Sequence, residues 1–188
     1  MKHIATMTLM LNLGVASVYA HDKPVTMTFS GTAAASTVNL QQPNTNNSEE
    51  DLAGTGTLGA FTFRNISAQT ASPQPSSACS GPTQIYLLRV AGAGVFRFQD
   101  GSLLKVNIVG GGDCIDFAAL EAHCTLTFQI MGGTGRFKNA SGTLTFNETG
   151  VPVLADALNN PVYFSETGEF TGTISGVSSE EDREDKQQ

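Results

Sequence analysis

The chain has 188 residues, a formal net charge of −7 and 40% hydrophobic residues. This length suffices for one domain with a buried core. An acidic surface repels phosphate backbones and anionic lipid, so nucleic acid is not an expected partner.

The first twenty residues have the pattern of a secretory signal peptide. Lys2 precedes an apolar run, Ile4–Val18, and small residues end at Ala20. A retained membrane anchor is the alternative, but polar residues interrupt the run, which is short for a bilayer span. We therefore expect residues 1–20 to be removed and the mature protein to be secreted or periplasmic, without a membrane span.

After residue 21, apolar residues recur at every second position, which is the period of a half-buried β-strand. In chain order the pattern appears in VTMTF (25–29), GAFTFRN (59–65), IYLLRVAGAGVFRFQ (85–99), LLKVNIV (103–109), CTLTFQI (124–130), GTLTFNE (142–148) and PVYFSETGEFTGTIS (161–175). In the third segment the alternation assigns Tyr86, Leu88 and Val90 to the buried face, and Arg89 to the opposite face.

The connections have turn and loop compositions. Asp100-Gly101 and Asn159-Asn160-Pro161 are turn signals between strand patterns. Two polar stretches, 41–54 and 70–82, are expected to be loops, and 117–123 holds at most one helical turn.

Seven or eight such strands without helices must bury their apolar faces against one another. A single closed antiparallel β-barrel over residues 21–177 is the predicted all-β fold, with a β-sandwich as the alternative. The acidic stretch 178–188 is expected to be a solvated, disordered tail.

An exported chain with three cysteines is expected to form one disulfide. Cys114 and Cys124 flank one loop and are the predicted pair, and Cys79 is the competitor for either. No metal site is expected, because His21 and His123 are the only histidines after residue 20 and their spacing to the cysteines fits no zinc motif.

The stretch MGGTGRFKNASG (131–142) fits either a phosphate-binding loop or a tight turn. It lacks the Lys of a Walker motif, and period-two patterns flank it on both sides, which favours the turn. We expect Gly132, Gly133 and Gly135 to form the turn and Phe137 to close the end of the sheet.

The segment FQIMGGTGRFKNASGTLTF (128–146) resembles the strand-turn-strand signature of allene oxide cyclases and dirigent proteins, and most closely their bacterial secreted relatives. The resemblance implies an eight-stranded, calycin-like barrel with an apolar axial cavity. It also implies cofactor-free steering of the cyclisation or coupling of an apolar intermediate, and it leaves room for a homo-oligomer. The chain has Ser141 where dirigent proteins usually have Arg.

Strand parity selects the polar side chains that share a face with apolar ones. Glu148 and Glu166 are the candidate catalytic residues, because a hairpin centred near Ala157 would place them opposite each other on the inward face. Two such carboxyls would share a proton and serve as a general acid or stabilise a cation. The other interpretation is a pair of ordinary solvated glutamates at the barrel mouth. The candidate ligand contacts are Tyr86, Asn65, Phe128 and Phe164.

Two functions are compatible with these features. The first is a barrel that binds a small hydrophobic molecule and steers its cyclisation without a cofactor. The second is a non-enzymatic structural or interaction protein of the cell envelope, whose interior is filled. A cavity of roughly 300 Å³ or more would favour the first.

Overall fold

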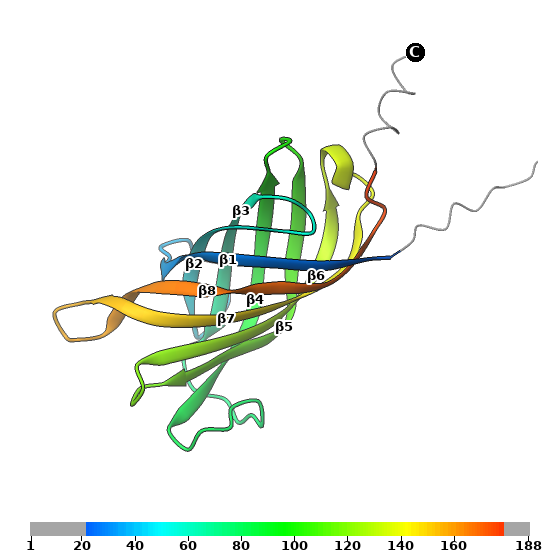
Figure 1. Ribbon diagram of the computed structural model, residues 1–188. Helices are drawn as coiled ribbons and strands as arrows, with labels where there is room; N and C mark the ends of the chain where they lie inside the picture. Colours follow the sequence, from blue (N-terminus) through cyan, green and yellow to red (C-terminus); the bar gives the residue numbers. More distant parts are fainter. Residues whose placement is uncertain (1–21, 179–188) are drawn as a thin grey trace, which may run out of the picture.

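A computed structural model describes residues 22–178, so the predicted signal peptide and all but the first residue of the acidic tail lie outside the described residues. Within residues 22–178 the chain forms eight strands and one short 3₁₀ helix (Figure 1). The elements are β1 (Lys23–Ala35), β2 (Thr45–Gly56), β3 (Phe61–Thr70), β4 (Gln84–Phe98), β5 (Leu103–Asp116), β6 (Glu121–Gly133), η1 (Gly135–Phe137), β7 (Ser141–Ala155) and β8 (Pro161–Ser175).

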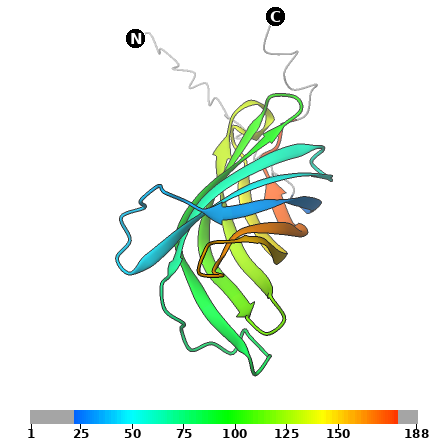
Figure 2. The ribbon, with the colours of Figure 1, turned by 90° about the vertical axis from the view of Figure 1, so that its left-hand side faces the viewer.

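Each strand pairs antiparallel with the next along the chain, and β8 pairs with β1, which closes the barrel. This confirms the predicted eight-stranded barrel and rules out the sandwich. Figure 2 views the barrel from the side of the β1–β2 and β7–β8 hairpins. No helix within residues 22–178 has the length and apolar character needed to cross a bilayer.

The prediction that the polar stretch 41–54 is a loop is wrong. Most of it belongs to β2, which pairs with β1 through Met27–Ala35 and with β3 through Phe61–Thr70. The strand was missed because its inward residues include Ser48 and Glu50, so the sequence shows little apolar alternation there. Pairing on both edges holds this segment extended.

One end of the barrel is closed by aromatic packing. Nine of the eleven phenylalanines are buried. Phe170 is central, with ring centroids 4.9 Å from Phe96 and 5.0 Å from Phe146. Phe137 of η1 is fully buried against Phe98, and the guanidinium of Arg136 lies 4.5 Å from the Phe137 ring. This confirms that the turn after β6 closes the barrel end.

The glycines of that turn act in two different ways. Gly132 and Gly135 have positive φ values of 74° and 58°, which glycine adopts without strain. Gly133 has no positive φ; a Cβ there would lie 1.8 Å from the Leu103 carbonyl oxygen. The stretch is a turn between strands, as predicted, and Gly133 permits close approach of two backbones.

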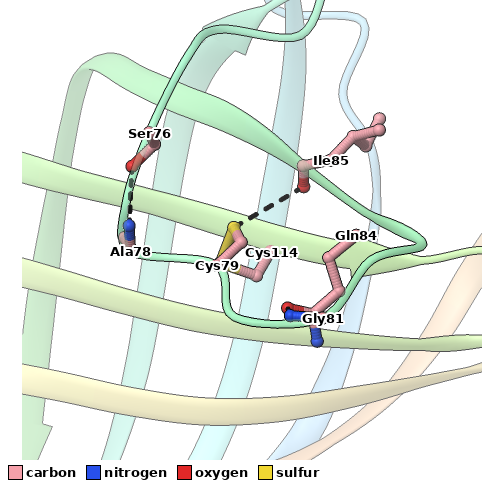
Figure 3. Close-up of a disulfide and its surroundings, with 7 residues drawn as sticks. All are labelled: Ser76, Ala78, Cys79, Gly81, Gln84, Ile85 and Cys114. Carbon is pink, nitrogen blue, oxygen red and sulfur yellow. Dashed lines mark hydrogen bonds between the residues drawn. A yellow bond between two sulfur atoms is a disulfide. The ribbon is translucent and has the colours of Figure 1, made fainter.

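The disulfide joins Cys79 to Cys114, not Cys114 to Cys124 (Figure 3). Cys124 is a free, buried thiol. In the β5–β6 register, Cys114 pairs with His123 and Asp113 pairs with Cys124, so alternation points the Cys114 and Cys124 side chains to opposite faces of the wall. The connector between β3 and β4 brings Cys79 to the outer face, where Cys114 meets it.

Candidate ligand-binding cavity at the open end

The opposite end of the barrel holds a cavity of about 590 Å³. It lies where the β1–β2, β3–β4, β5–β6 and β7–β8 connections gather, and all eight strands contribute to its lining. Its apolar lining includes Ala33, Ile115, Phe117, Leu120 and Phe164, and three buried acids, Asp113, Glu148 and Glu166, also line it. The volume exceeds the value at which a ligand site is favoured over a filled interior.

Two β-bulges determine which side chains reach the cavity. Ala68 pairs with Ala91 but Gln69 pairs with Arg89, so β4 carries one extra residue at Val90. β5 carries a corresponding extra residue at Val109. Each bulge reverses the inward and outward alternation for the rest of its strand.

The reversal in β4 and β5 corrects the predicted faces. Leu88 and Val90 are exposed, whereas Leu87 is buried and the Arg89 side chain is only 9% exposed. Tyr86 therefore lies on the outer face, beside Gly112, and is not among the residues that line the cavity.

Arg89 is the centre of a buried polar network. Its Nε donates to Asp113 Oδ2 at 2.7 Å and its Nη2 donates to Asp113 Oδ1 at 3.0 Å, a two-point contact. Its Nη1 donates to Ser48 Oγ at 2.8 Å and to Ser67 Oγ, and lies 3.4 Å from Glu50 Oε1. Burial alone would lower the pKa of Arg89, but the Asp113 carboxylate raises it above its ordinary value. The guanidinium therefore stays charged.

Asn65 lies next to this network, as one of the predicted interior polar residues. It is fully buried, and its Nδ2 donates to Glu50 Oε2 at 3.0 Å. Burial raises the pKa of Glu50, against the opposing effects of Arg89 and Asn65. Asn65 orients Glu50 and does not line the cavity.

Glu148 and Glu166 lie together in the cavity wall and are 8% and 5% exposed. Both face inward, as predicted, but the register differs from the prediction by two residues. Glu148 pairs with Gly168 and Glu166 with Gly150, so the two acids are diagonal neighbours whose side chains hydrogen bond to each other. The turn is centred at Leu158 because Asp156 caps it, accepting hydrogen bonds from the backbone NH groups of Leu158 and Asn160.

This environment favours the protonated carboxyls. Burial raises the pKa of Glu166 to about 7, and burial together with the nearby Glu50 and Glu166 raises the pKa of Glu148 well above its ordinary value. One oxygen of each carboxyl, Oε2, is buried without a hydrogen-bond partner among the described residues. The pair therefore holds at least one proton near neutral pH, and it has unmet hydrogen-bonding capacity.

The remaining predicted contacts fall in different places. Phe164 lines the cavity. Phe128 is fully buried in the aromatic core, with its ring 5.9 Å from that of Phe63, so it supports the barrel interior below the cavity.

Three charged residues of the site were not predicted from the sequence. Glu50 lies in a stretch whose composition predicts a loop. Arg89 lies just before the bulge at Val90 and Asp113 lies after the bulge at Val109, and alternation alone cannot locate these bulges. Two signals were present in the sequence. Arg89 is a charged residue within a mostly apolar pattern, and three glycines, 110–112, directly follow the second bulge.

Within residues 22–178, no group of three metal-ligating side chains is arranged to hold a metal ion. The arrangement can hold a small molecule against an apolar wall, with a proton-sharing carboxyl pair in contact with it. No protein-family model and no curated protein matches the chain. The likeness to the allene oxide cyclase and dirigent barrels stays a prediction.

Proposed function

We propose that this protein binds a small hydrophobic molecule in the open end of its barrel and steers the cyclisation of that molecule without a cofactor. The observation that carries the proposal is the cavity of about 590 Å³ that has Glu148 and Glu166 in its wall. Drug-sized ligands occupy cavities of this size, which are mostly apolar with a few convergent polar groups.

The carboxyl pair supplies the chemistry. A proton retained near neutral pH is available to a bound ligand as a general acid. After that proton has moved, the resulting carboxylate stabilises positive charge that develops during ring closure. Arg89 pairs with Asp113 and Glu50, and these ion pairs hold the buried polar side chains near the carboxyl pair in place.

The proposal also includes the cellular compartment and the oligomeric state of the protein. The Cys79–Cys114 disulfide is the kind of bond that persists in an oxidising compartment, which supports export to the periplasm or the exterior. The family resemblance also leaves a homo-oligomer open.

The test is native mass spectrometry of protein purified from its own cell, together with binding of the neutral apolar fluorophore N-phenyl-1-naphthylamine. We expect a co-purifying apolar molecule and saturable fluorophore binding. Ala33→Trp, which fills the cavity, should abolish both, and Thr32→Trp on the outer face of the same strand should retain both. Absence of both signals from the unmodified protein would refute the binding function.

The second candidate is an interaction protein of the cell envelope. Exposed apolar side chains on the β7–β8 hairpin favour it, namely Val151, Val153, Leu154 and Leu158. Leu154→Ser with Leu158→Ser would then weaken association measured by analytical ultracentrifugation or crosslinking, and would leave fluorophore binding unchanged.

A further inference from the structure

The charges around the cavity are strongly unequal. Among the described residues that line it there is one basic side chain, Arg89, and five carboxyl side chains: Asp113, Asp116, Glu121, Glu148 and Glu166. Arg89 is already held by both oxygens of Asp113 and lies beside Glu50. The direct contacts of Arg89 therefore go to Asp113, Glu50 and two serines, and its charge offsets only part of the effect that raises the pKa values of Glu148 and Glu166.

The pair also has room beside it. Gly150 lines the cavity, and a Cβ at this position would lie 3.4 Å from Glu148 Oε1 and 3.8 Å from Glu166 Cγ. Since Gly150 has no positive φ, its backbone does not require glycine. The missing side chain leaves a small hollow next to both carboxyls, and each carboxyl keeps one buried oxygen without a partner.

Part of the cavity lining is apolar and reaches the solvent. Phe164 lies in the cavity wall, and Phe117 and Leu120 line the outer part with 60% and 58% of their surfaces exposed. Exposed aromatic and aliphatic side chains at a cavity rim suit a ligand whose apolar part extends outward.

We propose that the cavity is selective for amphiphilic amines, with the ammonium group seated in the hollow at Gly150 between Glu148 and Glu166, and the apolar part directed past Phe164 toward Phe117 and Leu120. This inference rests on the proposed function and deepens it, since a bound ammonium carries the charge that a cyclisation intermediate would carry. A carboxylate–ammonium contact inside a low-dielectric wall is strong compared with the same contact in water.

Binding of the ammonium displaces a proton. The ligand enters with its positive charge, one carboxyl proton leaves to solvent, and the carboxylate pairs with the ammonium. The ionisable groups around the pair come from four other strands, while β1 contributes none at this level. They are Glu50 of β2, Arg89 of β4, Asp113 of β5 and Cys124 of β6. Burial raises the pKa of the Cys124 thiol well above its ordinary value, so this group stays neutral.

The experiment compares three probes of matched length, octylamine, 1-octanol and octanoate, by isothermal titration calorimetry on the full protein. At pH 8 we expect octylamine to bind at least tenfold more tightly than 1-octanol, and octanoate to bind most weakly. Lowering the pH through 7 should weaken octylamine and leave 1-octanol unchanged. At pH 6, heats measured in buffers of different ionisation enthalpy should show release of close to one proton.

Variants assign the effect to the pair. Glu166→Gln keeps the shape and removes the charge, so it should abolish the preference for octylamine while 1-octanol still binds. Glu169→Gln is the matched control, because Glu169 lies on the same strand and its alternation places it on the outer face. Glu148→Gln should reduce the preference in the same way as Glu166→Gln.

The outcomes separate the two proposals. If 1-octanol binds as tightly as octylamine, the amine selectivity is wrong and the hydrophobic cavity function stands. If octylamine binds preferentially but both glutamine variants retain the preference, the ammonium lies elsewhere and the inference is wrong. If none of the probes binds, the proposed function fails and the inference fails with it.

Discussion

The two ends of this barrel use the same strands for opposite purposes. At the closed end, nine phenylalanines interdigitate and Phe137 with Arg136 seals the exit. At the open end, the remaining two, Phe117 and Phe164, line a cavity that also contains five carboxyls and one guanidinium. One end is stabilised by burial of apolar surface, and the other retains buried polar groups that cost free energy unless they are paired.

The difference shows how a small barrel separates stability from function. Dense aromatic packing at one end supplies enough favourable free energy to hold the strands, so the other end need not be filled. The two bulges lie between these regions, and they change which side chains face inward where the aromatic core gives way to the polar site.

The largest expected loss of stability comes from replacing one of two phenylalanines on β8, and the other serves as its comparison. Phe170→Ala removes the central ring of the closed end and should lower the free energy of unfolding by about 3–5 kcal/mol. Phe164→Ala, in the half-buried wall of the cavity, should cost about 1 kcal/mol and should weaken fluorophore binding. Urea unfolding measures both, and equal losses would show that the open end is packed as tightly as the closed end.

The second prediction concerns the buried charges of the open end. Arg89→Met leaves Asp113 and Glu50 without their cation, and the free energy of unfolding at pH 7 should fall by about 3–5 kcal/mol. The double variant Arg89→Met/Asp113→Leu should regain part of that loss.

Arg64→Met is the control for Arg89. Arg64 also contacts an aspartate, Asp51, at 2.7 Å, but the two side chains are 81% and 57% exposed. An exposed pair contributes at most about 1 kcal/mol, so the free energy of unfolding of this variant should be close to that of the unmodified protein.

The third prediction is a pH dependence of stability. Since the pKa of Glu166 is raised to about 7 in the folded protein, the folded state binds more protons than the unfolded chain between about pH 4.5 and 7. The free energy of unfolding should therefore fall as the pH rises through this window, by up to about 3 kcal/mol. Urea unfolding at several pH values measures the slope. Glu166→Gln should make this slope less steep and Glu169→Gln should leave it unchanged; a flat profile in the unmodified protein would mean that the pair is solvated.

The smallest expected loss of stability concerns Gly133, in the turn at the closed end. Gly133→Ala brings a Cβ against the Leu103 carbonyl, which must move, at a cost of about 1–3 kcal/mol. Gly59→Ala is the comparison, because Gly59 has a φ of 91° and open space around its Cβ position, so only backbone strain of about 1 kcal/mol is expected. If thermal unfolding ranks the two in the reverse order, close approach is not the reason for Gly133.

The closed end could be predicted from the sequence with few errors. Alternation over 25–29, 61–63, 96–98, 126–130 and 144–146 places each buried aromatic or aliphatic side chain correctly. The turn glycines and Phe137 were also identified, because turn chemistry acts over a few neighbouring residues. Inward placement of Glu148 and Glu166 followed from the same parity, and only the turn centre at Leu158 shifted their register.

The open end depended on contacts between distant parts of the chain. Cys79 meets Cys114 across 35 residues of sequence, and β2 becomes a strand through pairing with its neighbours. Arg89 turns inward because Val90 is an extra residue in β4 relative to β3. A local pattern determines strand faces as long as apolar side chains mark them. Where polar side chains point inward and bulges shift the register, only pairing with neighbouring strands decides which residues meet.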